Sequence, residues 1–150
     1  MAVSGVAVDG YLCSVSAHPL AAGAGHEIVL GRHRAWTPRL AVRWLRGQAA
    51  RLADALDPAP GRGPLPTAVL RPVLDGSPDP GGAFRAWLAD DGLQEEQLAS
   101  LRSGRNVGVT ARDAELLYSL SAQPIPVDAF QPWGPSVVGA PVAGAGVRVP

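Results

Sequence analysis

The segment from Thr37 to Leu56 decides most of the predicted fold, and it reads TPRLAVRWLRGQAARLADAL. Thr37 is a favourable N-cap, and Pro38 stands at the first helical position, where its missing N–H costs nothing. Apolar residues then recur every three or four positions, which places them on one helical face. They are Ala41, Leu45, Ala49, Leu52 and Leu56, with Leu40 and Trp44 widening the stripe. Because Pro58 and Pro60 stop the pattern, we predict one long amphipathic helix ending near Leu56.

The opposite face of this helix is rich in arginine. Arg39, Arg43 and Arg46 fall together there, and Trp36 and Trp44 lie close by in the sequence. The planar guanidinium group suits phosphates and carboxylates. We therefore take these five residues, together with Trp133 near the C-terminus, as candidate partner-binding residues. The same pattern also describes an ordinary amphipathic helix with a solvated basic side.

The residues before this helix have the composition of β-structure. Two apolar runs, 3–8 and 11–17, flank Asp9-Gly10, and Asp-Gly between such runs is a strong hairpin signal because a type I′ turn needs two positive φ angles. A third run, 26–30, reads His-Glu-Ile-Val-Leu and is followed by Gly31. We predict an antiparallel hairpin that the third run extends to a three-stranded sheet.

The residues after the long helix alternate between chain breakers and helical patterns. A Pro/Gly-rich loop over 57–66 and a short apolar run over 67–74 come first. We then predict a block of three helices, over 83–90, 93–103 and 111–121. Gly104 ends the second of these, Thr110 caps the third, and Asp113 forms a capping-box variant. The prediction is a single α+β domain over residues 1–122.

The last part of the chain, 123–150, is an apolar arm punctuated by proline and glycine. Its composition cannot sustain a regular helix or an inner strand, so we expect it to be extended or disordered in isolation. Trp133 and several valines make it apolar rather than charged. An arm of this kind more often lies along a partner or its own domain than in water.

The formal net charge of zero hides a division between two successive segments. The 13 basic residues, all arginine, balance 13 acidic ones over the whole chain, which argues against broad charge-driven binding of nucleic acid. Residues 31–71 nevertheless hold eight arginines against Asp54 and Asp57, a net of +6, whereas residues 75–128 have a net of −5. The two segments either face each other or lie on separate solvated surfaces. Alternatively, the basic segment forms a face that is free to bind a partner.

The soft metal ligands and nucleophiles are few. Cys13, His18, His26 and His33 lack the close paired spacing of a zinc site, so we predict no metal and no cofactor. Cys13 with a histidine could form a nucleophile and base pair, but a cysteine in the middle of a strand is usually a small core residue.

The composition also indicates where in the cell the protein is located. No run approaches the roughly 18 apolar residues of a membrane span, and the first ten residues lack the charged start of a signal peptide. The single Cys13 cannot form an internal disulfide, which fits a reducing compartment. We therefore expect a cytoplasmic protein, or one within a particle assembled in the cell.

These observations favour a non-enzymatic interaction or assembly module, which binds a protein partner or itself through the arginine-rich helix, the sheet edge and the apolar arm. The main alternative is a nucleic-acid-binding transcriptional regulator with Arg39, Arg43 and Arg46 on phosphates. The acidic residues in the third predicted helix weaken that reading, because a major-groove reader should be basic there. A small-molecule enzyme that uses Cys13 and a histidine is the second alternative.

Overall fold

Two strands from the start of the chain and two from its end form one antiparallel sheet. The computed structural model describes residues 7–23, 25–59, 61–62, 66, 68 and 76–127. The sheet has the order β2-β1-β4-β3, so that β2 and β3 are its edges. The elements, in chain order, are β1 (Val8–Pro19), β2 (Ile28–Ala35), α1 (Pro38–Leu56), α2 (Pro80–Ala89), α3 (Asp91–Arg102), β3 (Val107–Arg112) and β4 (Leu116–Pro126).

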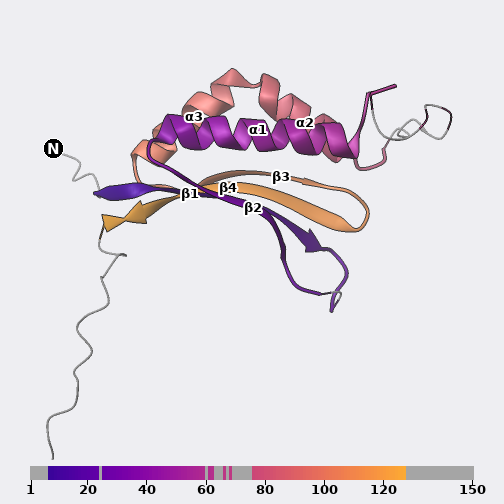
Figure 1. The fold of residues 1–150 in the computed structure, drawn as a ribbon, viewed down its shortest axis with the longest axis horizontal. Coiled ribbons are helices and arrows are strands. Elements are labelled where there is room, and N and C mark those ends of the chain that lie inside the picture. Colours follow the sequence, from indigo (N-terminus) through magenta and orange to yellow (C-terminus); the bar gives the residue numbers. More distant parts are fainter. Residues whose placement is uncertain are drawn as a thin grey trace, which may run out of the picture.

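The three helices cover one face of the sheet, with α1 lying directly along it (Figure 1). No helix in the described part of the chain lies on the other face (Figure 1). This arrangement of an antiparallel sheet with helices on one side confirms the predicted α+β class, including the long amphipathic helix.

The core fills the space between the sheet and the helices. Alternate residues of β1 and β4 face the helices, as the two-residue period of a strand requires, and α1 contributes Ala41, Leu45 and Ala49 from its predicted apolar face. The largest fully buried side chains are Phe84, Leu45, Leu101, Leu120, Val15 and Cys13.

The helix α1 begins at the position predicted from the sequence. The Thr37 side-chain oxygen accepts a hydrogen bond from the backbone N–H of Leu40 at 3.2 Å, and Pro38 follows Thr37 as the first helical residue. Two of the three helices predicted after α1 are also present, as α2 and α3. Gly104, with a φ of 79°, follows α3 where a left-handed residue was expected.

The predicted hairpin turn at Asp9-Gly10 is wrong. Both residues lie inside β1, and Gly10 has a φ of 115° at an irregularity in the pairing of β1 with β4. A Cβ on Gly10 would come within 2.9 Å of the Ala35 carbonyl oxygen. The positive φ that the sequence indicated therefore belongs to a β-bulge, and the chain reverses later, between the end of β1 and the start of β2. The third predicted strand is present but continues through Gly31 to Ala35.

The predicted helix over 111–121 is also wrong, because this stretch contains the end of β3 and most of β4. Tyr118 and Leu120 are buried while Ser119 between them is half-buried, which is the alternation of a strand. Asp113 does not cap a helix. Its side chain accepts hydrogen bonds from the N–H groups of Glu115 and Leu116 and from the Tyr118 hydroxyl, which fixes the turn between the strands.

Several predicted segments fall partly or wholly outside the described residues. These are most of the first apolar run, most of 63–75, and residues 128–150, which include Trp133. Strand β4 continues to Pro126 beside the start of β1, so it takes in the first four residues of the segment 123–150.

Candidate functional site: the groove between β2 and α1

A groove of about 600 Å³ lies between the edge strand β2 and the overlying helix α1. We call it the β2–α1 groove. It forms where α1, which begins soon after β2 ends, turns back over the sheet (Figure 1). Its lining residues are His33, Arg34, Ala35, Trp36, Leu40, Arg43, Trp44, Gly47, Gln48 and Arg51.

Two stacked pairs form the aromatic part of this groove. The His33 ring stacks on the Trp44 indole with a centroid distance of 5.7 Å and an interplanar angle of 12°. The Arg34 guanidinium lies 4.4 Å from the centre of the Trp36 ring, and it also binds the Asp9 carboxylate at 2.7 Å. Trp36 itself remains 66% exposed. The groove therefore offers a wide aromatic surface to solvent.

Gly47 opens the helical side of the groove. Arg43, Gly47 and Arg51 are spaced four residues apart, so they lie in one row along α1. A Cβ built on Gly47 would have nothing within 4 Å. The missing side chain thus leaves a gap between Arg43 and Arg51 on the surface of α1.

The groove is basic. Its lining includes Arg34, Arg43 and Arg51 but no acidic side chain. Asp9 compensates Arg34, whereas no ion pair is found for Arg43 or Arg51 within the described residues. A ligand carrying carboxylates would therefore meet Arg43 and Arg51, for which the described residues supply no ion-pair partner.

Strand β2 adds an apolar surface at the same edge of the sheet. Ile28, Val29 and Leu30 are 51%, 43% and 52% exposed. An edge strand also presents unpaired backbone N–H and C=O groups. The sequence indicated a strand here, but a short apolar run looks the same whether it is central or at an edge, so its exposure was not predicted.

Five of the six residues proposed from sequence lie in the described part of the chain, and they line two different hollows. Trp36, Arg43 and Trp44 line the β2–α1 groove. Arg39 and Arg46 instead line a second hollow of about 460 Å³ between α1 and α3, which Arg43 also reaches. Asp91 and Glu95 lie in that second hollow, so its charge is mixed.

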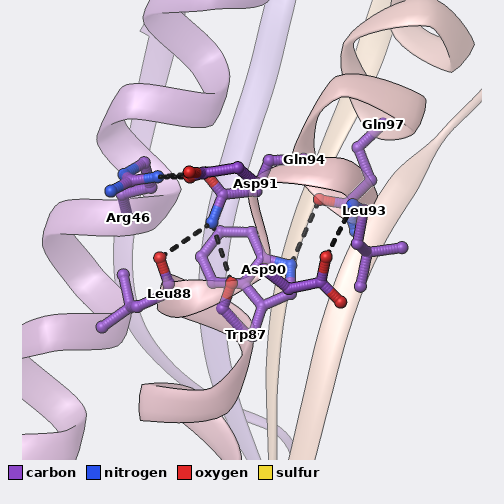
Figure 2. Close-up of polar contacts among 8 residues, drawn as sticks. All are labelled: Arg46, Trp87, Leu88, Asp90, Asp91, Leu93, Gln94 and Gln97. Atoms are coloured by element: carbon purple, nitrogen blue, oxygen red, sulfur yellow. Dashed lines mark hydrogen bonds and ion pairs between the residues drawn. The ribbon is translucent and has the colours of Figure 1, made fainter.

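Arg46 belongs to a polar network that joins the helices (Figure 2). Its guanidinium donates to the Gln94 side-chain oxygen and lies 3.8 Å from the Asp91 carboxylate. The Gln94 amide nitrogen in turn donates to the carbonyl oxygens of Trp87 and Leu88. This network links α1 to the corner between α2 and α3, and it engages Arg46 within the fold.

Gln97 extends the connection to the sheet. The Trp87 indole N–H donates to the Gln97 side-chain oxygen at 3.3 Å (Figure 2), and the Gln97 amide nitrogen donates to the Gly108 carbonyl at 3.0 Å. Buried Gln94 and Gln97 were not singled out from sequence, because a helix that mixes glutamine with glutamate resembles a solvated surface.

Cys13 shows no sign of an activated nucleophile. Its side chain is fully buried, and burial raises the pKa of the thiol to about 11. The thiolate is the reactive form, so at neutral pH almost none is present. Among the histidines, His33 stacks on Trp44, and His18 hydrogen-bonds to the Ser16 hydroxyl at 3.0 Å.

The described residues contain neither a cluster of metal ligands nor a membrane-spanning helix. No group of three or more His, Cys, Asp or Glu side chains gathers there as a metal site requires. None of the helices described here combines the length and the apolar character of a membrane span. Comparisons with protein-family models, with curated proteins and with solved structures find no match.

Proposed function

We propose that this protein is a non-enzymatic interaction module, and that it binds a protein partner along β2 and the adjoining β2–α1 groove. The observation that carries the proposal is the exposure of three consecutive apolar residues, 28–30, on the edge strand β2, whose other end lines an aromatic and basic groove. An edge strand with exposed apolar side chains is a site at which the strand of another protein can pair.

The location of these residues supports an interaction rather than a structural role. Exposed apolar strands at sheet edges promote aggregation, and proteins usually shorten, charge or cover them. Strand β2 has eight residues, and its arginines lie beyond the apolar part. A partner that covers residues 28–30 would remove this liability and bury apolar surface at the same time.

Capture of a partner from cells of the source organism tests the proposal. The full chain is compared with the double variant Val29→Lys, Leu30→Lys, and we expect the partner to be lost. The matched control places the same added charge at the opposite edge of the sheet, through Asn106→Lys and Thr110→Lys, both of which replace exposed residues. The control is expected to retain the partner.

Two results would contradict the proposal. One is a chain that remains monomeric by light scattering and captures no protein. The other is a chain that binds duplex DNA with an affinity falling steeply with salt and lost in Arg39→Ala, Arg43→Ala, Arg51→Ala, which would instead favour the nucleic-acid-binding alternative. Arg46 is left unchanged in this test because of its contacts with Gln94 and Asp91.

A further inference from the structure

We infer that the partner surface recognised by β2 is an acidic, extended segment, which adds to the sheet as a fifth strand beneath α1. This inference rests on the proposed function and specifies the chemistry of the partner. It combines three features of the same edge: an unpaired strand, a groove above it, and arginines on both sides of it.

The backbone of β2 is the first feature. β2 pairs with β1 on one side, and within the described residues it has no neighbour on the other. A strand added there would lie about 4.8 Å from β2 and would form main-chain hydrogen bonds along it. Main-chain pairing supplies affinity without requiring one particular partner sequence.

The groove is the second feature. In the register with β1, Gly31 and His33 lie opposite Val15 and Cys13, which are core residues. These β2 positions therefore face the helices, and so would alternate side chains of an added strand. The space available to those side chains is the groove beside Trp44, with the gap left by Gly47. Apolar or aromatic side chains fit there.

The arginines are the third feature. Arg32 pairs with Ser14, so it lies on the sheet face away from the helices. Arg43 and Arg51 stand on the helical side. An added strand would thus meet positive charge on both of its faces. In a strand that alternates acidic and apolar residues, the carboxylates would lie on the face of Arg32 and the apolar side chains would enter the groove, where Arg43 and Arg51 add to the positive charge that attracts an acidic segment.

The same charges disfavour a second copy of this chain as the occupant. Pairing β2 with β2 would bring Arg32 of both copies to one edge, and like charges across strands are destabilising. Charged side chains on an edge strand are a common device against self-pairing. The charge of β2 therefore selects a partner of opposite sign.

Titration of the full ¹⁵N-labelled chain with synthetic peptides tests this inference. The probe alternates acidic and apolar residues, with the sequence acetyl-Glu-Val-Asp-Phe-Glu-Val-Asp-amide. One counterpart replaces every acidic residue by lysine, and another replaces both valines by proline, which removes backbone donors. We expect the acidic peptide to shift the β2 amide signals and slow their hydrogen exchange, and both counterparts to bind at least about tenfold more weakly.

Variants of the protein, each with a matched control, test where the acidic peptide binds. The double variant Arg32→Gln, Arg43→Gln removes one arginine from each face that an added strand would meet. Its affinity for the acidic peptide is expected to fall on the order of tenfold. The control, Arg105→Gln with Arg112→Gln, removes the same charge from exposed positions outside the groove and should change the affinity less than about twofold. Gly47→Leu fills the gap in α1 and is expected to reduce binding, whereas Gly47→Ala should do so less.

The outcomes separate this inference from the proposed function. Equal binding of the acidic and lysine peptides, or no binding while partner capture still depends on residues 29 and 30, overturns the acidic-strand inference and leaves the proposed function standing. A concentration-dependent dimer abolished by Val29→Lys, Leu30→Lys also overturns it, in favour of a second copy. Loss of both peptide binding and β2-dependent capture overturns both.

Discussion

At the scale of single residues, the structure assigns Cys13 to the core. Its side chain is fully buried, on the face of β1 that the helices cover. Burial disfavours the thiolate because a charged sulfur loses its hydration there. Cys13 therefore acts as a small apolar residue, and its ionisation affects the stability of the fold rather than a reaction.

The raised pKa of Cys13 predicts a loss of stability at alkaline pH. The folded-state pKa is about 11, above that of an unfolded thiol near 8.5, so the unfolded chain releases its proton first as the pH rises. The stabilisation is fully present below about pH 8.5 and is lost progressively toward pH 11. Urea denaturation between pH 7.5 and 10.5 should show this decline.

The control for this prediction is Cys13→Ala, which lacks the titrating thiol. It should lose less stability than the parent chain over the same pH range. The remaining decline is expected from Tyr11 and Tyr118, because burial raises the pKa of both hydroxyls as well. A parallel pH dependence of parent and variant would contradict the assignment to Cys13.

At the scale of elements, two glycines in helices have opposite roles. Gly47 in α1 has open space where a Cβ would stand, whereas a Cβ on Gly81 in α2 would come within 2.6 Å of the Asp57 Cβ. Gly81 is buried where α2 packs against the end of α1, next to the contact between Arg85 and Asp57. One glycine opens a surface and the other permits close packing.

The same substitution should therefore change stability in opposite directions at these positions. We expect Gly47→Ala to stabilise the fold by about 0.5–1 kcal/mol, because alanine lowers the backbone entropy cost of helix formation. Gly81→Ala should destabilise it by about 1–3 kcal/mol through overcrowding. Chemical denaturation of both variants measures the difference, and a destabilised Gly47→Ala would show that the gap in α1 is closed in solution.

At the scale of the whole molecule, apolar residues are divided between the core and one exposed edge. Leu120 on the central strand β4 is fully buried, while Leu30 on the edge strand β2 is 52% exposed. The two leucines have the same chemistry, so the difference in their burial comes only from their places in the sheet.

This division predicts unequal effects on folding. Leu120→Ala should reduce the free energy of unfolding by about 2–5 kcal/mol, because it leaves a cavity in the core. Leu30→Lys should change it by less than about 0.5 kcal/mol, as for other exposed positions. Denaturation of the two variants tests this. A large loss of stability in Leu30→Lys would show that Leu30 is buried within the molecule and is not a docking surface.

Much of the fold was predictable from local patterns. Thr37, Pro38 and the apolar repeat specified α1, and Gly104 marked the end of α3, because capping and helical period depend on neighbouring residues. The stretch 111–121 was misassigned because its leucines at 116, 117 and 120 also match a three- and four-residue spacing. Of the candidate site, Trp36, Trp44, Arg43 and Arg51 were identified as part of a basic and aromatic surface, but the exposure of Ile28 to Leu30 and the opening at Gly47 were not.

The sequence by itself determined the class of most elements, the caps of α1, and a basic helix face flanked by tryptophans. Only the tertiary structure decided that β4 enters the sheet beside β1, through pairs such as Ser14 and Ser121, which are 107 residues apart. Because β4 occupies the other side of β1, β2 is left at the edge of the sheet, with its apolar residues at 28–30 exposed. Local periodicity determines which residues share a face, whereas the neighbour of each strand depends on the packing of the whole chain.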